Sequence, residues 1–206
     1  YNEPSAILMS RDQLVTDWVA SRFPNQSVEI APASADASFR RYFRLTWADG
    51  STRILMDAPP DKEDCTPFIH VAGLLAMADL AAPRILDQDL ANGFLVLTDL
   101  GRIGYLDALN ADLSIADLLI RPVLDMLVKW QLSSTAATLP PYDATLLRRE
   151  LDLFPEWFVG RHLGIELADE DKVMLDRTFK FLINSALNQP KVFVHRDFMP
   201  RNLMVV

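Results

Sequence analysis

The sequence predicts an α+β fold with two lobes, a small β-rich N-terminal lobe and a mainly helical C-terminal lobe. Segments with strand character fall before residue 98, where they alternate with helical patterns. Beyond Leu100-Gly101, apolar residues recur at helical spacing in three long segments. We therefore expect an N-lobe over residues 1–98, and a hinge followed by a helical C-lobe over residues 99–206.

The N-lobe begins with a predicted helix over residues 10–23. Ser10 and Gln13 have the spacing of a capping box, and apolar residues follow at helical spacing. From residue 28 to 57 the pattern favours strands, and the turn Trp47–Ser51 divides the segment into a hairpin.

A second helix is expected from Pro67 to about Asp79, with Thr66 as its N-cap. A second strand pair is expected at residues 84–87 and 94–98. The predicted order is thus helix, hairpin, helix, hairpin.

The C-lobe is predicted to contain helices over residues 114–132, 143–162 and 169–187. Pro122 lies inside the first, which favours a kink or a split. Asp143 is the expected N-cap of the second, which should end before Gly164, and Pro190 stops the third.

Composition narrows the class of protein. The 206 residues carry a net charge of −8, which argues against a nucleic-acid partner because phosphate backbones attract basic surfaces. Cys65 is the only cysteine, so no intrachain disulfide is possible and a reducing compartment is expected. No signal segment or membrane-spanning run is evident, and we expect a cytoplasmic protein without a membrane partner.

The segment from Val192 to Val205 carries the strongest functional signal. An apolar stretch, expected to be a strand, leads into His195-Arg196-Asp197, and Asn202 follows Asp197 by five residues. This H-R-D-x-x-x-x-N spacing is that of a phosphotransferase catalytic loop, in which the Asp takes the proton of the attacking hydroxyl and the Asn holds a metal ion.

Several motifs resemble the aminoglycoside phosphotransferase superfamily, which has a protein-kinase-like fold. Within it they most resemble the bacterial anomeric kinases that phosphorylate N-acetylmuramate and N-acetylglucosamine in peptidoglycan recycling. The resemblance runs from about Ser34 onward through the catalytic loop and these segments: Ala37–Arg44, Ile54–Pro60, Phe94–Gly101, Leu139–Asp143 and Leu153–Phe158.

The resemblance implies ATP and Mg²⁺ as cofactors, a small-molecule sugar as partner, and a role for each matching residue. It implies Asp197 as catalytic base, His195 as the residue that braces the loop, and Asn202 as a metal ligand. It matches residues 35–41 to the loop that covers the phosphates and residues 97–101 to the hinge, so nucleotide contacts are expected at Ser38, Phe39, Arg40, Arg41, Leu97, Thr98, Asp99 and Leu100.

The sequence departs from the protein-kinase pattern in its charges. Met56-Asp57 stands where the strand lysine is expected, and His70 lies near the position of its acidic partner. The phosphate charge must then be met by other cations, for which the candidates are Arg40, Arg41, Arg44 and Arg53.

Only Leu203–Val206 follow Asn202, so we expect that the C-lobe is truncated and that a second metal-binding Asp lies beyond Val206. The oligomeric state is not predicted.

Simpler interpretations remain open for individual residues. His195 alone would suit a strand end, and the arginine cluster at residues 40–44 would suit a charged sheet edge. Trp157 and Phe158 have the spacing of core residues rather than of a sugar platform, and Arg148, Arg149 and Arg161 would suit either a solvated helix face or a substrate carboxylate.

Three hypotheses for the function follow. The first is an ATP-dependent kinase of the anomeric hydroxyl of N-acetylmuramate and N-acetylglucosamine. The second keeps the chemistry but changes the acceptor to an aminoglycoside or another small-molecule hydroxyl. The third is a nucleotide-binding pseudokinase, which the missing lysine and acidic partner favour.

Overall fold

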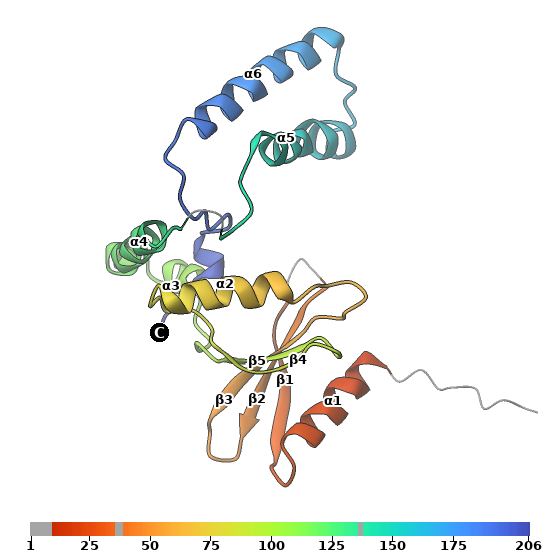
Figure 1. The fold of residues 1–206 in the computed structure, drawn as a ribbon, viewed down its shortest axis with the longest axis vertical. Coiled ribbons are helices and arrows are strands. Elements are labelled where there is room, and N and C mark those ends of the chain that lie inside the picture. The colour runs from red at the N-terminus through yellow and green to blue at the C-terminus, as the bar shows by residue number, and fades with distance from the viewer. Residues whose placement is uncertain (1–9, 36–38, 136–137) are drawn as a thin grey trace, which may run out of the picture. The chain divides into compact units, whose positions relative to one another are not determined.

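The computed structural model describes residues 10–35, 39–135 and 138–206 (Figure 1). The chain forms two compact units. The first comprises the described residues up to Trp130 together with Arg196–Val206, and the second spans Gln131–His195. A five-stranded antiparallel sheet and six α-helices make up most of the described residues, so the predicted α+β class is confirmed.

The sheet lies in the first unit and has the strand order β1-β2-β3-β5-β4. Both predicted hairpins are present, as β2–β3 and β4–β5. Local patterns did not reveal β1 as a separate paired strand, nor the pairing of β3 with β5 that joins the hairpins, because distant pairing leaves no local signal. The strands are β1 (Val28–Ala35), β2 (Arg41–Trp47), β3 (Thr52–Asp57), β4 (Ile85–Asp89) and β5 (Phe94–Thr98).

A helix covers each face of this sheet. Successive side chains of a strand point to opposite faces, so Leu55 packs in the core cluster with α1 (Arg11–Arg22) and Met56 packs in the cluster with α2 (Thr66–Met77). Figure 1 shows α1 and α2 on opposite sides of the sheet. The ends of β2, β3 and β5 are therefore fixed between two apolar layers.

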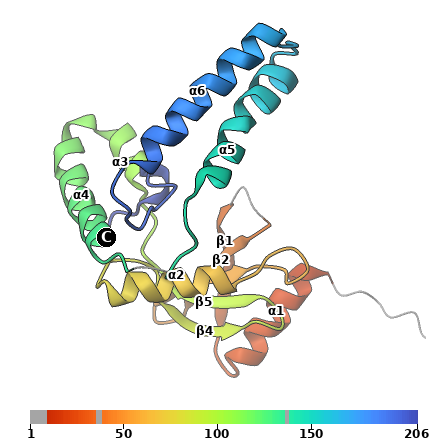
Figure 2. The same cartoon turned by 45° about the horizontal axis from the view of Figure 1, so that its top comes forward.

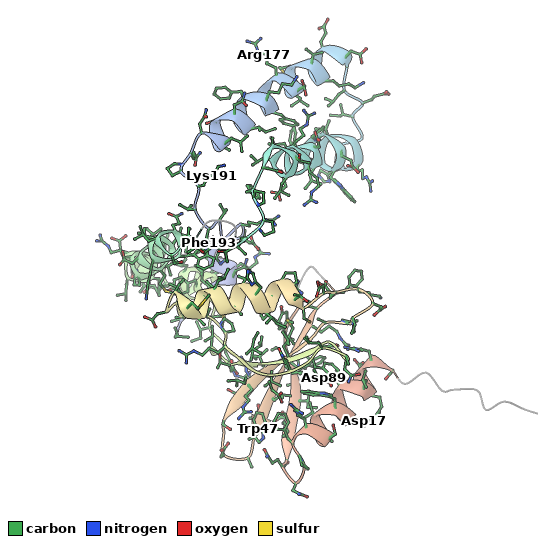
Figure 3. All side chains as sticks on the ribbon, viewed as in Figure 1. Asp17, Trp47, Asp89, Arg177, Lys191 and Phe193 are labelled. Atoms are coloured by element: carbon green, nitrogen blue, oxygen red, sulfur yellow. The ribbon has the colours of Figure 1, made fainter. Side chains whose placement is uncertain are left out.

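Helix α1 is capped and attached as its sequence predicts. The hydroxyl of Ser10 accepts the N–H of Gln13 at 3.2 Å, which is half of the expected capping box, whereas the Gln13 side chain donates to Asp17 at 2.8 Å. On the core side, the Trp18 indole N–H donates to Asp89 at 2.8 Å. Asp89 is labelled in Figure 3 at the end of β4, beside α1.

The predicted N-cap of α2 is wrong by one residue. The helix begins at Thr66, and Cys65 precedes it without a side-chain cap. The Thr66 N–H donates instead to the Asp64 carboxylate at 2.8 Å. A carboxylate two residues upstream accepts this N–H in an Asx turn, which leaves the Thr66 hydroxyl unnecessary for capping.

The start of the helical part also differs from the prediction. An unpredicted helix, α3 (Tyr105–Ala111), comes first, and Ser114 lies in a 3₁₀ turn, η1 (Leu113–Ile115), where its N–H donates to the Asp112 carboxylate. Helix α4 (Ala116–Leu132) then runs through Pro122 without the predicted split. A proline within a helix removes one backbone hydrogen bond, and the turns on either side keep theirs.

The second unit is a helical pair, α5 (Ala144–Leu153) and α6 (Asp169–Leu187), which lie side by side in both views (Figure 2). Asp143 caps α5 and α6 has the predicted bounds. The predicted continuation of α5 to His162 is not α-helical but a π-helix, η2 (Phe154–His162). Pro155 has no N–H for an α-helical bond, and the wider helix closes with the Leu163 N–H on the Phe158 carbonyl at 3.0 Å.

Gly93 is required where the β4–β5 turn meets the end of β3. Its φ is +73°, and a Cβ there would lie 1.9 Å from the Ala58 carbonyl oxygen. The close approach permits the hydrogen bond from the Ala58 N–H to the Gly93 carbonyl, 2.8 Å long. The two atoms nearest to this Cβ, the carbonyl oxygen and carbon of Ala58, belong to the backbone, so no side-chain rotation relieves the contact.

We predict that Gly93→Ala lowers the free energy of unfolding by at least about 3 kcal/mol, since it combines left-handed strain with a backbone clash. Gly50→Ala is the matched control, because Gly50 has φ +81° and an added Cβ meets nothing within 4 Å. The control is expected to cost about 1 to 2 kcal/mol from backbone strain alone. Urea unfolding of both variants measures the difference, and equal losses would contradict the clash.

Candidate active site

Asp197 and Asn202 face each other across the predicted catalytic loop. The Asn202 amide donates to the Asp197 carboxylate at 2.6 Å and to the Asp197 carbonyl at 3.0 Å. A 3₁₀ turn, η3 (Pro200–Asn202), produces this approach, and the Asn202 N–H donates to the Met199 carbonyl at 2.9 Å. Asp197 and Asn202 are both exposed.

The loop is anchored to the segment that follows the hinge. The Tyr105 N–H donates to the Leu203 carbonyl and the Val205 N–H donates to the Ile103 carbonyl, each at 2.9 Å. Between them, Gly104 and Met204 form an isolated antiparallel bridge. The residues after Asn202 thus pair with the start of α3, which fixes the C-terminal side of the loop.

The N-terminal side of the loop differs from the prediction. The prediction of a strand at Val192–Val194 is wrong, and this segment has no regular secondary structure. Phe193, labelled in Figure 3, is buried, and its N–H donates to the Ser134 hydroxyl at 2.5 Å instead of to a neighbouring strand. His195 is exposed and is the last residue of the second unit, and its bracing role stays a prediction.

Phe39 and Arg40 of the predicted phosphate loop both bind Glu63. The Phe39 N–H donates to one carboxylate oxygen at 3.1 Å and Arg40 Nε donates to the other at 3.2 Å. Burial, the largest influence on the Arg40 side chain, lowers its pKa, but the neighbouring Tyr42 and Glu63 outweigh it and the pKa is raised overall. Ser38 lies outside the described residues.

Arg41 and Asp57 belong to an ion cluster that sequence reasoning missed. Asp57, the last residue of β3, has no exposed surface and accepts hydrogen bonds from Arg11 at 2.5 and 2.8 Å and from Arg41 at 2.7 and 3.0 Å. Its place after Met56, where a lysine was expected, was the one available signal. A buried carboxylate needs such partners.

The predicted hinge segment is fixed by a buried ion pair between Arg44 on β2 and Asp99, which follows β5. Arg44 donates to the two carboxylate oxygens at 2.5 and 3.0 Å and to the Gly101 carbonyl at 2.6 Å. The Arg44 hydrogen bond outweighs burial and lowers the pKa of Asp99 to about 2. Asp99 also accepts the Gly101 N–H at 2.9 Å, so its carboxylate serves the hinge itself.

The other hinge residues keep their places in the sheet. Leu97 is buried and pairs with β3 and β4, and the Thr98 N–H donates to the Arg84 carbonyl at 2.9 Å. Asp99 and Leu100 lie beyond the last strand residue. The backbone N–H and C=O groups of Asp99 and Leu100 therefore lie outside the hydrogen-bond ladder of the sheet.

The cations expected at the phosphates have partners of their own. Arg40, Arg41 and Arg44 each bind a carboxylate. Arg53 lies over the Trp47 ring at 5.0 Å. In the second unit, Arg148 binds Asp152 and Asp176, and Arg161 binds Glu156 and stacks over Trp157.

The aromatic residues of the π-helix are not core residues in the described part of the chain. Phe154, Trp157 and Phe158 are 49%, 52% and 48% exposed. The Phe154 and Phe158 rings stack with centroids 5.6 Å apart, and Phe158 stacks on His162 at 5.7 Å. The expectation of core residues was wrong for the described part of the chain, where about half of each of these side chains is exposed.

The residues present fit a magnesium ion in part. Because the Asn202 amide nitrogen faces Asp197, its oxygen is the atom that can bind a metal. Across the described ranges, no cluster of three acidic, histidine or cysteine residues is suitably placed to hold a metal.

No helix in the described part of the chain is long and apolar enough to cross a membrane.

Comparison with known sequences identifies the family. Residues 29–206 match the Phosphotransferase enzyme family. The chain belongs to this family. The match contains the sheet, the hinge and the Asp197–Asn202 loop, whereas α1 precedes it.

Among curated proteins, three relatives of this family member bear the name N-acetylmuramate/N-acetylglucosamine kinase. The protein from Pseudomonas aeruginosa is 52% identical over 206 residues, covering 95% of this chain and 60% of the relative. That from Pseudomonas putida is 54% identical over 175 residues, covering 85% and 51%. That from Neisseria meningitidis is 40% identical over 199 residues, covering 96% and 59%. The chain therefore spans about half to three fifths of these relatives.

We predict that the Arg44–Asp99 pair makes stability depend on pH in the acid range. The pKa of Asp99 falls from an ordinary 3.8 to about 2 on folding, so its contribution is present above pH 4 and is lost as the pH falls through 2. The stability difference between the wild type and Asp99→Asn should shrink by about 2 kcal/mol over this interval. Denaturant unfolding from pH 2 to 6 measures it.

The control is Asp49→Asn, because Asp49 is an exposed turn carboxylate whose pKa is lowered by hydrogen bonds from the nearby Ser51 rather than by a buried arginine, so a smaller change over the same pH interval is expected. A difference between wild type and Asp99→Asn that stays constant from pH 6 to pH 2 would contradict the role of the ionised pair.

Proposed function

We propose that the protein is an ATP-dependent kinase that phosphorylates the anomeric hydroxyl of N-acetylmuramate and N-acetylglucosamine. The contact between Asp197 and Asn202 carries the proposal, because it places a base and a metal ligand together as the reaction requires. The names of the three relatives support this choice of acceptor.

In the proposed reaction, Asp197 takes the proton of the sugar hydroxyl. The hydroxyl oxygen forms a bond to the γ-phosphorus of ATP while the bond from that phosphorus to the bridging oxygen breaks, and ADP leaves with the electron pair. Asn202 holds one carboxylate oxygen of Asp197, which orients the other oxygen toward the acceptor. General-base assistance of this kind contributes about 10² to 10⁴ in rate.

Asn202 would hold Mg²⁺ through its amide oxygen. When bound, the ion neutralises charge on the β- and γ-phosphates. The described residues offer no cluster of three suitable side chains, and the relatives are longer than this chain. We propose that the remaining ligand is an acidic residue outside the 206 residues.

The nucleotide is proposed to lie between the Phe39–Arg41 segment and the hinge at Leu97–Leu100. Leu97 and Thr98 form the end of the sheet, and the backbone of Asp99 and Leu100 is expected to meet the adenine edge. In this proposal residues 1–98 act as the N-lobe and residues 99–206 as the hinge and C-lobe. ATP is available in the cytoplasm, which is the proposed location.

The substrate test uses the protein expressed from its complete gene. We expect ADP release that depends on N-acetylmuramate or N-acetylglucosamine, measured in a coupled assay, and none with aminoglycosides. Turnover with aminoglycosides alone would show that the acceptor is an aminoglycoside and not one of the two sugars. Binding of ATP without turnover on any acceptor would favour the pseudokinase and contradict the proposal.

We predict that Asp197→Asn lowers turnover by about 10²- to 10⁴-fold while ATP affinity is retained. The new amide is nearly isosteric and its oxygen can still accept the Asn202 N–H, so the loop is preserved. Steady-state rates and ATP titration measure the two effects. The control is Asp107→Asn, because Asp107 is an exposed residue of α3. Wild-type turnover by Asp197→Asn would show that Asp197 is not the catalytic base.

A further inference from the structure

The first turn of α1 reaches the residues that begin β2. Arg11 donates to Asp57, and its neighbour Asp12 accepts from Arg41 at 2.5 Å. Arg41 therefore has a carboxylate on two sides of its guanidinium, one from the sheet and one from the helix. The cluster of two arginines and two aspartates is neutral as a whole.

The buried position of Asp57 makes the two arginines depend on each other. The carboxylate has no exposed surface, and its four hydrogen bonds are divided equally between Arg11 and Arg41. Loss of one guanidinium leaves a buried anion with half of its donors, which is strongly unfavourable. The position of Arg41 is thus tied to the presence of Arg11.

Arg11 is itself fixed by the sheet. It also donates to the Asn92 carbonyl at 2.5 Å, and its guanidinium lies 4.7 Å from the centre of the Phe94 ring. Helix α1 is therefore locked to the β4–β5 turn as well as to the end of β3. A rigid attachment of this kind can hold a neighbouring segment in one conformation.

Arg41 directly follows Phe39 and Arg40, which the proposed function places against the nucleotide. Those two residues bind Glu63, which lies between β3 and α2, and Arg41 binds Asp57 at the end of β3, so one end of the loop is held by two carboxylates. The loop end cannot move without breaking one of these pairs.

We propose that α1 is a positioning element of the nucleotide site: Arg11, acting through the buried carboxylate of Asp57 and assisted by Asp12, fixes Arg41 and thereby holds Phe39 and Arg40 ready for the phosphates. The inference rests on the proposed function for its nucleotide. Helix α1 precedes the residues that match the family, so this support comes from outside the matched region.

The test compares Arg11→Met with Trp18→Phe in the protein expressed from its complete gene. Trp18→Phe removes the α1 contact to Asp89 and weakens the same helix without touching Asp57. We expect Arg11→Met to raise the Kd for ATP about fivefold, as a fall of the binding-competent fraction to about one fifth requires. The KM for the sugar should stay unchanged, and Arg11→Lys should restore part of the affinity.

A second control uses the other end of α1. Arg22 binds Asp87 on β4, and their side chains are 48% and 26% exposed, whereas those of Arg11 and Asp57 are 26% and 0% exposed. Arg22→Met is expected to leave ATP affinity at the wild-type value. Equal Kd values for wild type and Arg11→Met, or an equal rise in Trp18→Phe, would overturn the inference.

Hydrogen exchange separates this inference from the proposed function. In the absence of nucleotide, a peptide that contains Phe39–Tyr42 should exchange faster in Arg11→Met than in the wild type and in Trp18→Phe. If wild type fails to bind ATP while this difference appears, the proposed function is wrong and the positioning of Arg41 by Arg11 stands. If ATP binds and exchange is unchanged, the positioning role of Arg11 is wrong.

Discussion

The buried ion pair between Arg44 and Asp99 is the interaction on which the arrangement of the first unit depends. It joins β2 to the residue after β5, and the same guanidinium binds the Gly101 carbonyl. A short distance along the chain, Ile103–Tyr105 pairs with Leu203–Val205, directly after the catalytic loop. One ordered segment, residues 99–105, thereby connects the sheet to the Asp197–Asn202 contact. Its geometry depends on the Arg44–Asp99 ion pair, which is almost fully shielded from water and therefore needs both of its charges.

The arginines around the start of β2 are bound to carboxylates of the protein itself. The arginines of residues 40–44 are each bound to a carboxylate, and two of those carboxylates, Asp57 and Asp99, are almost fully buried. Arginine suits such positions because its planar fork satisfies both oxygens of a carboxylate. The proposed phosphate binding at the loop would then rely on backbone N–H groups, or on arginines that exchange a carboxylate for a phosphate.

The second unit shows how one residue alters the pattern of a helix. Pro155 follows an ordinary α-helix and the chain continues as a π-helix, where Phe154, Phe158 and His162 form a stack of half-exposed rings. An α-helix with the same sequence would direct these residues differently. Arg161, which lies 3.8 Å from the centre of the Trp157 ring, adds a cation to this surface.

The sequence by itself determined the α+β class, both hairpins and the bounds of α6, because caps and turns are local properties; the catalytic roles of Asp197 and Asn202 stay a prediction from motif spacing. It did not determine the pairing of β3 with β5, the π-helix, or the lack of a strand at Val192–Val194. It also missed Asp57 and the partners of the arginines, since Arg11 and Asp57 are separated by 46 positions in the chain. Only the tertiary structure decided these contacts, because a buried charge is defined by neighbours that folding brings together.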